Sequence, residues 1–152
     1  MKRVILLLAM LLAMPAFACS LGSLEFSPIF ETGSSRLSGA EMLRLAGWRA
    51  DLRSRFPKAG EFYVEVPESK AAGVTQQLAE SRRVHLMNTL RNLGVDAADI
   101  KLSTVVKRSV DPFHLKSAGT KREAIRYINT ASIAISPRCP HACCPGPEPI
   151  QK

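Results

Sequence analysis

The chain has 152 residues, of which 46% are hydrophobic, and its formal net charge is +8. This length supports one hydrophobic core but is short for two separate domains. The positive charges are scattered along the sequence and aromatic residues make up only 6% of it. The composition therefore argues against a nucleic-acid-binding protein.

The first 18 residues have the pattern of a secretion signal. Lys2 and Arg3 form a basic start, residues 4–14 are an unbroken apolar stretch, and Ala16-Phe17-Ala18 matches the small-x-small pattern before a signal peptidase site. The apolar stretch is too short to cross a bilayer, which takes about 20 residues. We expect residues 1–18 to be removed, leaving no transmembrane segment and a protein of the periplasm or the outer-membrane periphery.

The remaining chain alternates strand and helix patterns. Four segments have the apolar alternation or β-branched content of strands: 24–30, 61–66, 100–106 and 130–136. Two segments have apolar residues at three- and four-residue steps, which is typical of helices: 39–56 and 75–93. Residues 110–120 predict a loop and residues 121–127 a short helical turn. The apolar faces predict a core that includes Leu45, Trp48, Leu52, Val64, Leu78, Leu86, Leu90, Ile133 and Ile135.

Both predicted helices have clear end signals. Ser38 and Glu41 form a capping-box pattern, in which the Ser38 hydroxyl accepts from the Glu41 amide and the carboxylate reaches back. Phe56-Pro57 ends the first helix and Gly94 ends the second. The order β-α-β-α-β-β predicts an α+β fold, with a small mixed sheet and two long helices on one face.

The second helix carries a recognisable motif. Residues 78–90 read LAESRRVHLMNTL and are followed by NLGV at 92–95. This stretch resembles the motif L-S-x-x-R-A-x-x-V-x-x-x-L and the following Gly-Val turn of the OmpA-like, peptidoglycan-binding domain family. Residues 30–38 are similar to the family's F-x-x-G-S-x-x-L segment before its first helix, and residues 129–133 to its closing strand. The resemblance covers about residues 25–136 and implies a divergent member with the family's two-layer fold.

The resemblance also implies a ligand site. In the family, an Asp after the second strand and an Arg in the second helix hold the diaminopimelate of the peptidoglycan stem peptide. Arg82 matches that Arg, and a guanidinium suits a carboxylate because it can donate two parallel hydrogen bonds. The family spacing puts Pro67 in place of the Asp, and Glu68 is the nearest carboxylate. Arg82 and Glu68 are therefore the predicted ligand-binding residues.

These features predict a non-enzymatic, monomeric envelope protein whose partner is peptidoglycan or another envelope protein. Catalysis is not expected, because no nucleophile triad, glycine-rich phosphate loop or pair of carboxylates stands in a supporting context. No cofactor is expected. Two alternatives stay open. One is a degenerate domain of this fold that has lost wall binding and acts as a periplasmic or secreted interaction module. The other is a periplasmic protein that handles thiols or metals.

All four cysteines lie near the ends of the processed chain: Cys19, Cys139, Cys143 and Cys144. In an oxidising compartment this placement favours disulfides. Our hypothesis is that Cys19 bonds one of the other three and joins the ends of a domain over residues 19–138; peptide mapping without reduction tests it. Lipidation of Cys19 is the less favoured alternative, because Ala16-Phe17-Ala18 lacks the Leu that lipoprotein signals usually carry.

The C-terminal residues 139–152 are rich in Cys and Pro and predict a disordered tail. Within them, the run Cys139-Pro140-His141-Ala142-Cys143-Cys144 is a possible metal cluster, because thiolates and imidazole suit zinc or copper. No matching Cys/His pair occurs elsewhere in the sequence, and disulfide formation competes for the thiols. The sequence therefore predicts no metal site.

Overall fold

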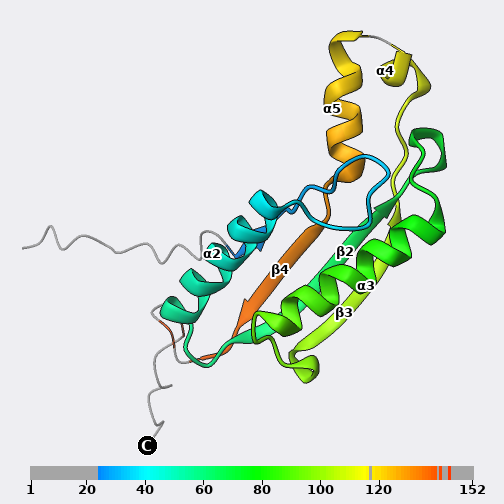
Figure 1. Cartoon of the computed structure of the whole chain (residues 1–152). Coiled ribbons are helices and arrows are strands. Elements are labelled where there is room, and N and C mark those ends of the chain that lie inside the picture. Colours follow the sequence, from blue (N-terminus) through cyan, green and yellow to red (C-terminus); the bar gives the residue numbers. More distant parts are fainter. Residues whose placement is uncertain (1–23, 117, 140, 142–143, 145–152) are drawn as a thin grey trace, which may run out of the picture.

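The protein is an α+β domain built on one mixed sheet. The computed structural model describes residues 24–116, 118–139, 141 and 144. Its strands are β1 (Glu25–Phe26), β2 (Gly60–Glu68), β3 (Ile100–Lys107) and β4 (Ser132–Pro137). They lie in the order β1-β4-β2-β3, as Figure 1 shows for the three long strands. β4 pairs antiparallel with β1 and β2, whereas β2 and β3 are parallel.

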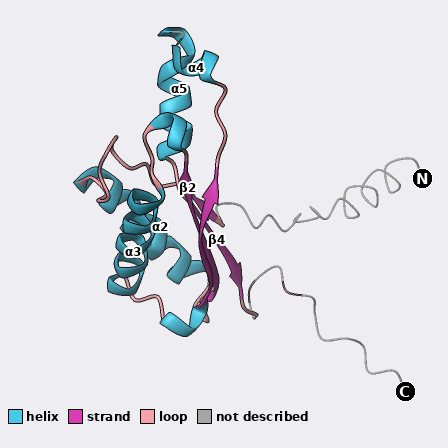
Figure 2. Ribbon diagram, turned by 90° about the vertical axis from the view of Figure 1, so that its right-hand side faces the viewer, coloured by secondary structure: helices cyan, strands magenta, loops and turns pink. Residues whose placement is uncertain are grey.

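Two long helices form the second layer. The helices α2 (Gly39–Arg55) and α3 (Gln76–Asn92) lie on the same face of the sheet (Figure 2). Two single-turn 3-10 helices, η1 (Lys70–Ala72) and η2 (Ala97–Asp99), flank α3 in the chain. The predicted arrangement of a small mixed sheet with two long helices on one face is confirmed. Within the described residues, no helix is both long and apolar enough to cross a membrane.

The core fills the space between the two layers. In β2 the residues that point toward the helices, Phe62, Val64 and Val66, are fully buried. They meet a set of buried residues from the helices and from β4: Leu45, Leu52, Leu86, Leu90, Ile133 and Ile135. Trp48 and Leu78, which the sequence also assigns to the core, are partly buried and pack against it. The hydrophobic periodicity therefore identified the inward faces correctly.

The N-terminal cap of α2 follows half of the predicted capping box. The Ser38 hydroxyl accepts from the Glu41 backbone N–H at 3.3 Å. The Glu41 carboxylate does not complete the box; it accepts from the Ile29 backbone N–H at 3.0 Å and from Arg44 at 2.6 Å. Glu41 thus fixes the segment that leads from β1 to α2, as well as the helix itself.

A helical arm differs from the sequence-based prediction. Residues 110–120 and 121–127, predicted as a loop and a short turn, contain α4 (Pro112–Lys116) and α5 (Ala118–Asn129). The two helices project beyond the end of the sheet (Figure 1). Among the α5 residues whose burial is described, only Ala124, Ile128 and Asn129 are buried, and all three lie in its C-terminal half. The buried residues Ala124 and Ile128 do recur at a helical step of four, but they are too few to extend a helix prediction over residues 118–129. The first strand is also shorter than predicted: β1 has two residues, whereas the sequence predicts a strand over residues 24–30.

Gly60→Ala is expected to destabilise the domain. Gly60 is buried opposite Pro137 at the start of β2, and a Cβ at this position would overlap the Ser136 carbonyl and the Pro137 Cα. Forcing a methyl group against packed backbone costs about 1–3 kcal/mol. Urea denaturation measures the change in the free energy of unfolding.

Gly47→Ala is the matched control and should have the opposite sign. Gly47 is exposed within α2, and nothing lies within 4 Å of the position of its Cβ. Alanine should therefore stabilise α2 by about 1 kcal/mol through helix propensity. Equal changes in the free energy of unfolding for the two variants would contradict the close packing of β4 against Gly60.

Candidate ligand-binding site

Arg82 lies in the middle of α3 and is fully buried. Its Nε donates to the Ser34 carbonyl at 2.8 Å. Its Nη2 donates to the Glu31 carbonyl at 3.0 Å and to Asn129 Oδ1 at 2.7 Å. Arg82 therefore joins three parts of the fold: α3, the turn before α2 and the C-terminal end of α5.

The charge of Arg82 has no carboxylate partner among these contacts. Desolvation by burial lowers its pKa to about 10, so the guanidinium is still charged at neutral pH. Its acceptors are neutral, and its Cζ lies 4.9 Å from the centroid of the Phe30 ring. Nη1 is buried and has no hydrogen-bond partner within the described part of the chain. One donor of a buried cation is thus available to an anionic group.

Glu68 ends β2 and lines a cleft at that edge of the sheet. The residue is only 8% exposed, and its backbone carbonyl accepts from the Arg108 N–H at 2.8 Å. The cleft has a volume of about 390 Å³. Besides Glu68, it is lined by Ser69, Lys70, Ala71, Lys107, Arg108, Ser109 and Val110. We call it the end cleft, because the carboxyl ends of the parallel strands β2 and β3 meet there.

The end cleft combines one carboxylate with cationic groups. Within the described residues, neither the Glu68 carboxylate nor the exposed ammonium groups of Lys70 and Lys107 form an ion pair. Arg108 is held in place, since its Nη1 donates to the Tyr127 carbonyl at 2.9 Å and the Thr130 carbonyl at 2.8 Å. The cleft therefore offers an acceptor for an ammonium group and donors for a carboxylate.

The two residues nominated by the sequence occupy different surroundings. No hydrogen bond or ion pair between described atoms joins Arg82 to Glu68, and Arg82 does not line the end cleft. Their joint action on one ligand stays a prediction. Sequence reasoning missed Lys70, Lys107 and Arg108. One signal could have found two of them: Lys107 and Arg108 directly follow the predicted strand 100–106. Residues that follow two parallel neighbouring strands lie at the same edge of the sheet, so these two could have been placed beside Glu68.

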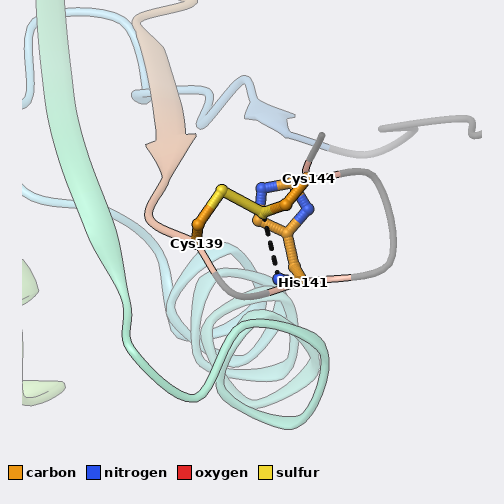
Figure 3. Close-up of side chains that lie close together, drawn as sticks. All are labelled: Cys139, His141 and Cys144. Atoms are coloured by element: carbon orange, nitrogen blue, oxygen red, sulfur yellow. Dashed lines mark hydrogen bonds between the residues drawn. A yellow bond between two sulfur atoms is a disulfide. The ribbon is translucent and has the colours of Figure 1, made fainter. Parts of the chain in front are cut away.

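The described part of the C-terminal segment forms a small disulfide loop (Figure 3). Cys139 is bonded to Cys144, and the His141 backbone N–H donates to Cys144 Sγ at 3.1 Å. The His141 ring packs edge-on against Phe56, which follows the last turn of α2, with 5.3 Å between the ring centroids. The start of the predicted tail is thus attached to the domain.

Several sequence-based expectations fall on residues outside the described ranges. They are the secretion signal over 1–18, Cys19, Cys143 and the tail beyond Cys144. The Cys139–Cys144 bond nevertheless narrows the disulfide hypothesis. Of the three candidate partners for Cys19, only Cys143 is left, and this pairing stays a prediction.

No protein-family model matches the sequence, and no curated protein matches it. Solved structures do match in three dimensions. The OmpA-like domain of FopA1 from Francisella tularensis aligns with a TM-score of 0.54 and 13% identity, over 78% of this chain and 75% of that one.

Two further matches are to MotB and to a MotB-like protein. The periplasmic domain of Helicobacter pylori MotB aligns with a TM-score of 0.52 and 18% identity, over 76% of each chain. A MotB-like protein from Desulfovibrio vulgaris aligns with a TM-score of 0.51 and 13% identity, over 75% of each chain. At these identities the likeness establishes the fold and carries nothing further about ligand or partner.

Proposed function

We propose that this chain, which has the OmpA-like fold, is a non-enzymatic domain of the cell envelope that binds the stem peptide of peptidoglycan. Residues 1–18 would export it, and the domain would work in the periplasm. The observation that carries the proposal is the end cleft, which the buried residue Glu68 lines together with Lys70 and Lys107. The motif over residues 78–90 supports the choice of ligand, because it resembles the helix of peptidoglycan-binding domains.

The chemistry of the end cleft fits a zwitterionic amino acid. The side chain of diaminopimelate ends in an ammonium and a carboxylate on the same carbon. In our proposal Glu68 accepts from the ammonium, and Lys70 and Lys107 donate to the carboxylate. Hydrogen bonds to charged groups are stronger than neutral ones, which gives a ligand with both charges an advantage over one with either alone.

Arg82 is the second proposed ligand residue. It matches the family Arg by position, and its Nη1 makes no hydrogen bond within the described residues, so this atom can donate to an anionic group. Because Nη1 is buried, a ligand carboxylate can reach it only if the atoms that cover it move.

The rival function is a protein-interaction module without wall binding. The projecting arm favours it, because Phe113 in α4 is 68% exposed and Tyr127 in α5 is 54% exposed. Exposed aromatic side chains are common in protein–protein contacts. If sacculi do not retain the protein, the interaction module becomes the preferred function.

Sedimentation with purified sacculi tests the proposed function. The chain without residues 1–18 should pellet with intact sacculi of a wall that contains diaminopimelate, and should stay in solution with sacculi stripped of stem peptides by an amidase. Equal retention by stripped sacculi would contradict the proposal, because a basic protein can adhere to anionic polymers through net charge alone. Absence of retention on intact sacculi would also contradict it.

A further inference from the structure

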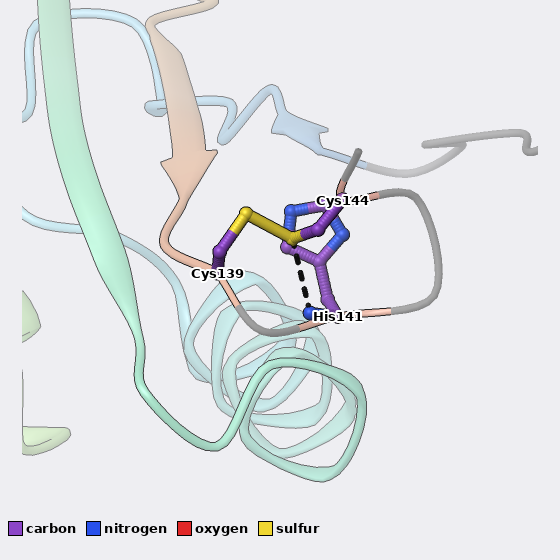
Figure 4. The surroundings of a disulfide bond; sticks show 3 residues. All are labelled: Cys139, His141 and Cys144. Atoms are coloured by element: carbon purple, nitrogen blue, oxygen red, sulfur yellow. Dashed lines mark hydrogen bonds between the residues drawn. A yellow bond between two sulfur atoms is a disulfide. The ribbon is translucent and has the colours of Figure 1, made fainter. Parts of the chain in front are cut away.

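We propose that Cys139, His141 and Cys144 form a binding site for a soft metal ion when their disulfide is reduced. One ligand atom from each residue lies within 4.8 Å of the others. All three come from one short loop at the C-terminal end of the domain (Figure 4). The site is independent of the end cleft and of the function proposed for it.

The donor set selects the class of metal. Two thiolates and one imidazole favour soft or borderline ions such as Cu(I) and Zn(II) over Mg(II) or Ca(II), which prefer oxygen. Zinc lies at about 2.3 Å from a thiolate and about 2.0 Å from an imidazole nitrogen, so donors around one ion stand roughly 3.5–4 Å apart. The imidazole nitrogen already lies within 4.8 Å of both sulfurs. The two sulfurs, which are bonded to each other in the disulfide, must move apart to this spacing after reduction.

The loop also contains contacts that would position the ligands. The Phe56 ring supports the His141 imidazole at 5.3 Å between centroids. The His141 backbone N–H donates to Cys144 Sγ at 3.1 Å, and such a bond stabilises a thiolate more than a thiol. Hydrogen bonds and packing around the first ligands commonly set metal affinity. The domain therefore supplies both the donors and part of their support.

The disulfide and the metal exclude each other. A dithiol donor transfers two electrons and two protons to the Cys139–Cys144 bond, which becomes two thiols, while the donor closes its own disulfide. A metal ion then binds both sulfurs and displaces the two thiol protons. A disulfide-containing oxidant reverses the exchange: it accepts the two electrons and becomes a dithiol, the Cys139–Cys144 bond forms again, and the ion is released. The loop would thus hold metal only under reducing conditions.

Metal content of the reduced and oxidised protein tests the proposal. The full processed chain is reduced without oxygen by a phosphine, mixed with Zn(II) or with Cu(I), desalted and analysed. Reduced protein should retain one ion per chain and oxidised protein none. Cys139→Ser and Cys144→Ser should abolish retention. His141→Ala should weaken affinity by at least about tenfold, which even the loss of an outer-shell partner can cause.

Matched variants separate this site from the other thiols and histidines. His114→Ala, an exposed residue of α4, should retain metal like the wild type. The double variant Cys19→Ser/Cys143→Ser should also retain one ion after reduction. The proposal is overturned if this double variant loses the ion, if oxidised protein binds as well as reduced protein, or if neither ion is retained. Circular dichroism checks that each variant is folded.

Discussion

Arg82→Ala should lower the free energy of unfolding by about 3 kcal/mol or more. The substitution removes the donors for the Ser34 and Glu31 carbonyls and for Asn129 Oδ1. Asn129 Oδ1 is buried, and leaving it without a partner costs about 1–3 kcal/mol, whereas the Ser34 and Glu31 carbonyls are only partly buried and cost less. The change also leaves a void beside Phe30, whose ring the guanidinium now covers. Urea denaturation with linear extrapolation measures the loss.

Arg83→Ala is the matched control, one residue further along α3. Arg83 is partly exposed and bonds Glu80 and Ser103. Partly solvated ion pairs contribute at most about 1 kcal/mol, so this alanine should have a small effect. Similar losses for Arg82→Ala and Arg83→Ala would contradict a structural role for Arg82. Arg82→Met should recover part of the loss, because its longer apolar side chain fills the space beside Phe30 that alanine leaves empty.

This structural role limits what Arg82 can reveal about binding. A variant that loosens the contacts between α3, the turn before α2 and α5 would lose any ligand with the fold. The residues of the end cleft are better probes, because Lys70 and Lys107 are exposed and their replacement disturbs no packing.

The parts of the fold that follow strong local patterns were predictable from the sequence. Alternation of Phe62, Val64 and Val66 with polar residues identified β2, and the Ser38 cap identified the start of α2. The arm was not predictable in the same way. Its order comes from a few buried residues at the base of α5, such as Ile128, and from contacts made by its backbone and by Asn129 with other elements.

The candidate site was predictable only in part. Position in a motif nominated Arg82, and the spacing from Ala79 and to Leu86 could also have shown that it lies on the buried face of α3. The cationic side of the end cleft depends on the register of two parallel strands, which pairs Glu68 with Lys107. β2 and β3 are parallel and are connected in the chain through α3, so their register is a tertiary property. No local pattern in either strand specifies it.

Glu68→Gln should weaken binding of a diaminopimelate-containing stem peptide by about tenfold or more. The amide keeps the shape of the side chain but removes the negative charge that faces the ligand ammonium. A hydrogen bond to a charged group contributes about 1.5–3 kcal/mol, and 1.4 kcal/mol corresponds to a factor of ten. An NMR titration measures the affinity, and the amide signals of residues 68–71 and 107–110 should shift most. Lys107→Gln should weaken binding through the ligand carboxylate.

Glu65→Gln is the control, since Glu65 lies on the same strand between the buried residues Val64 and Val66. Alternation along β2 therefore points Glu65 to the face of the sheet opposite the helices, away from the core. Its replacement should leave affinity unchanged. Arg82→Lys separates the two proposed ligand residues, provided its unfolding curve shows a folded protein. If folded Arg82→Lys loses the peptide while Glu68→Gln keeps it, the ligand binds at Nη1 of Arg82 and the end cleft is not its site. If Glu68→Gln alone loses it, the end cleft binds the peptide and Arg82 serves to hold the fold together.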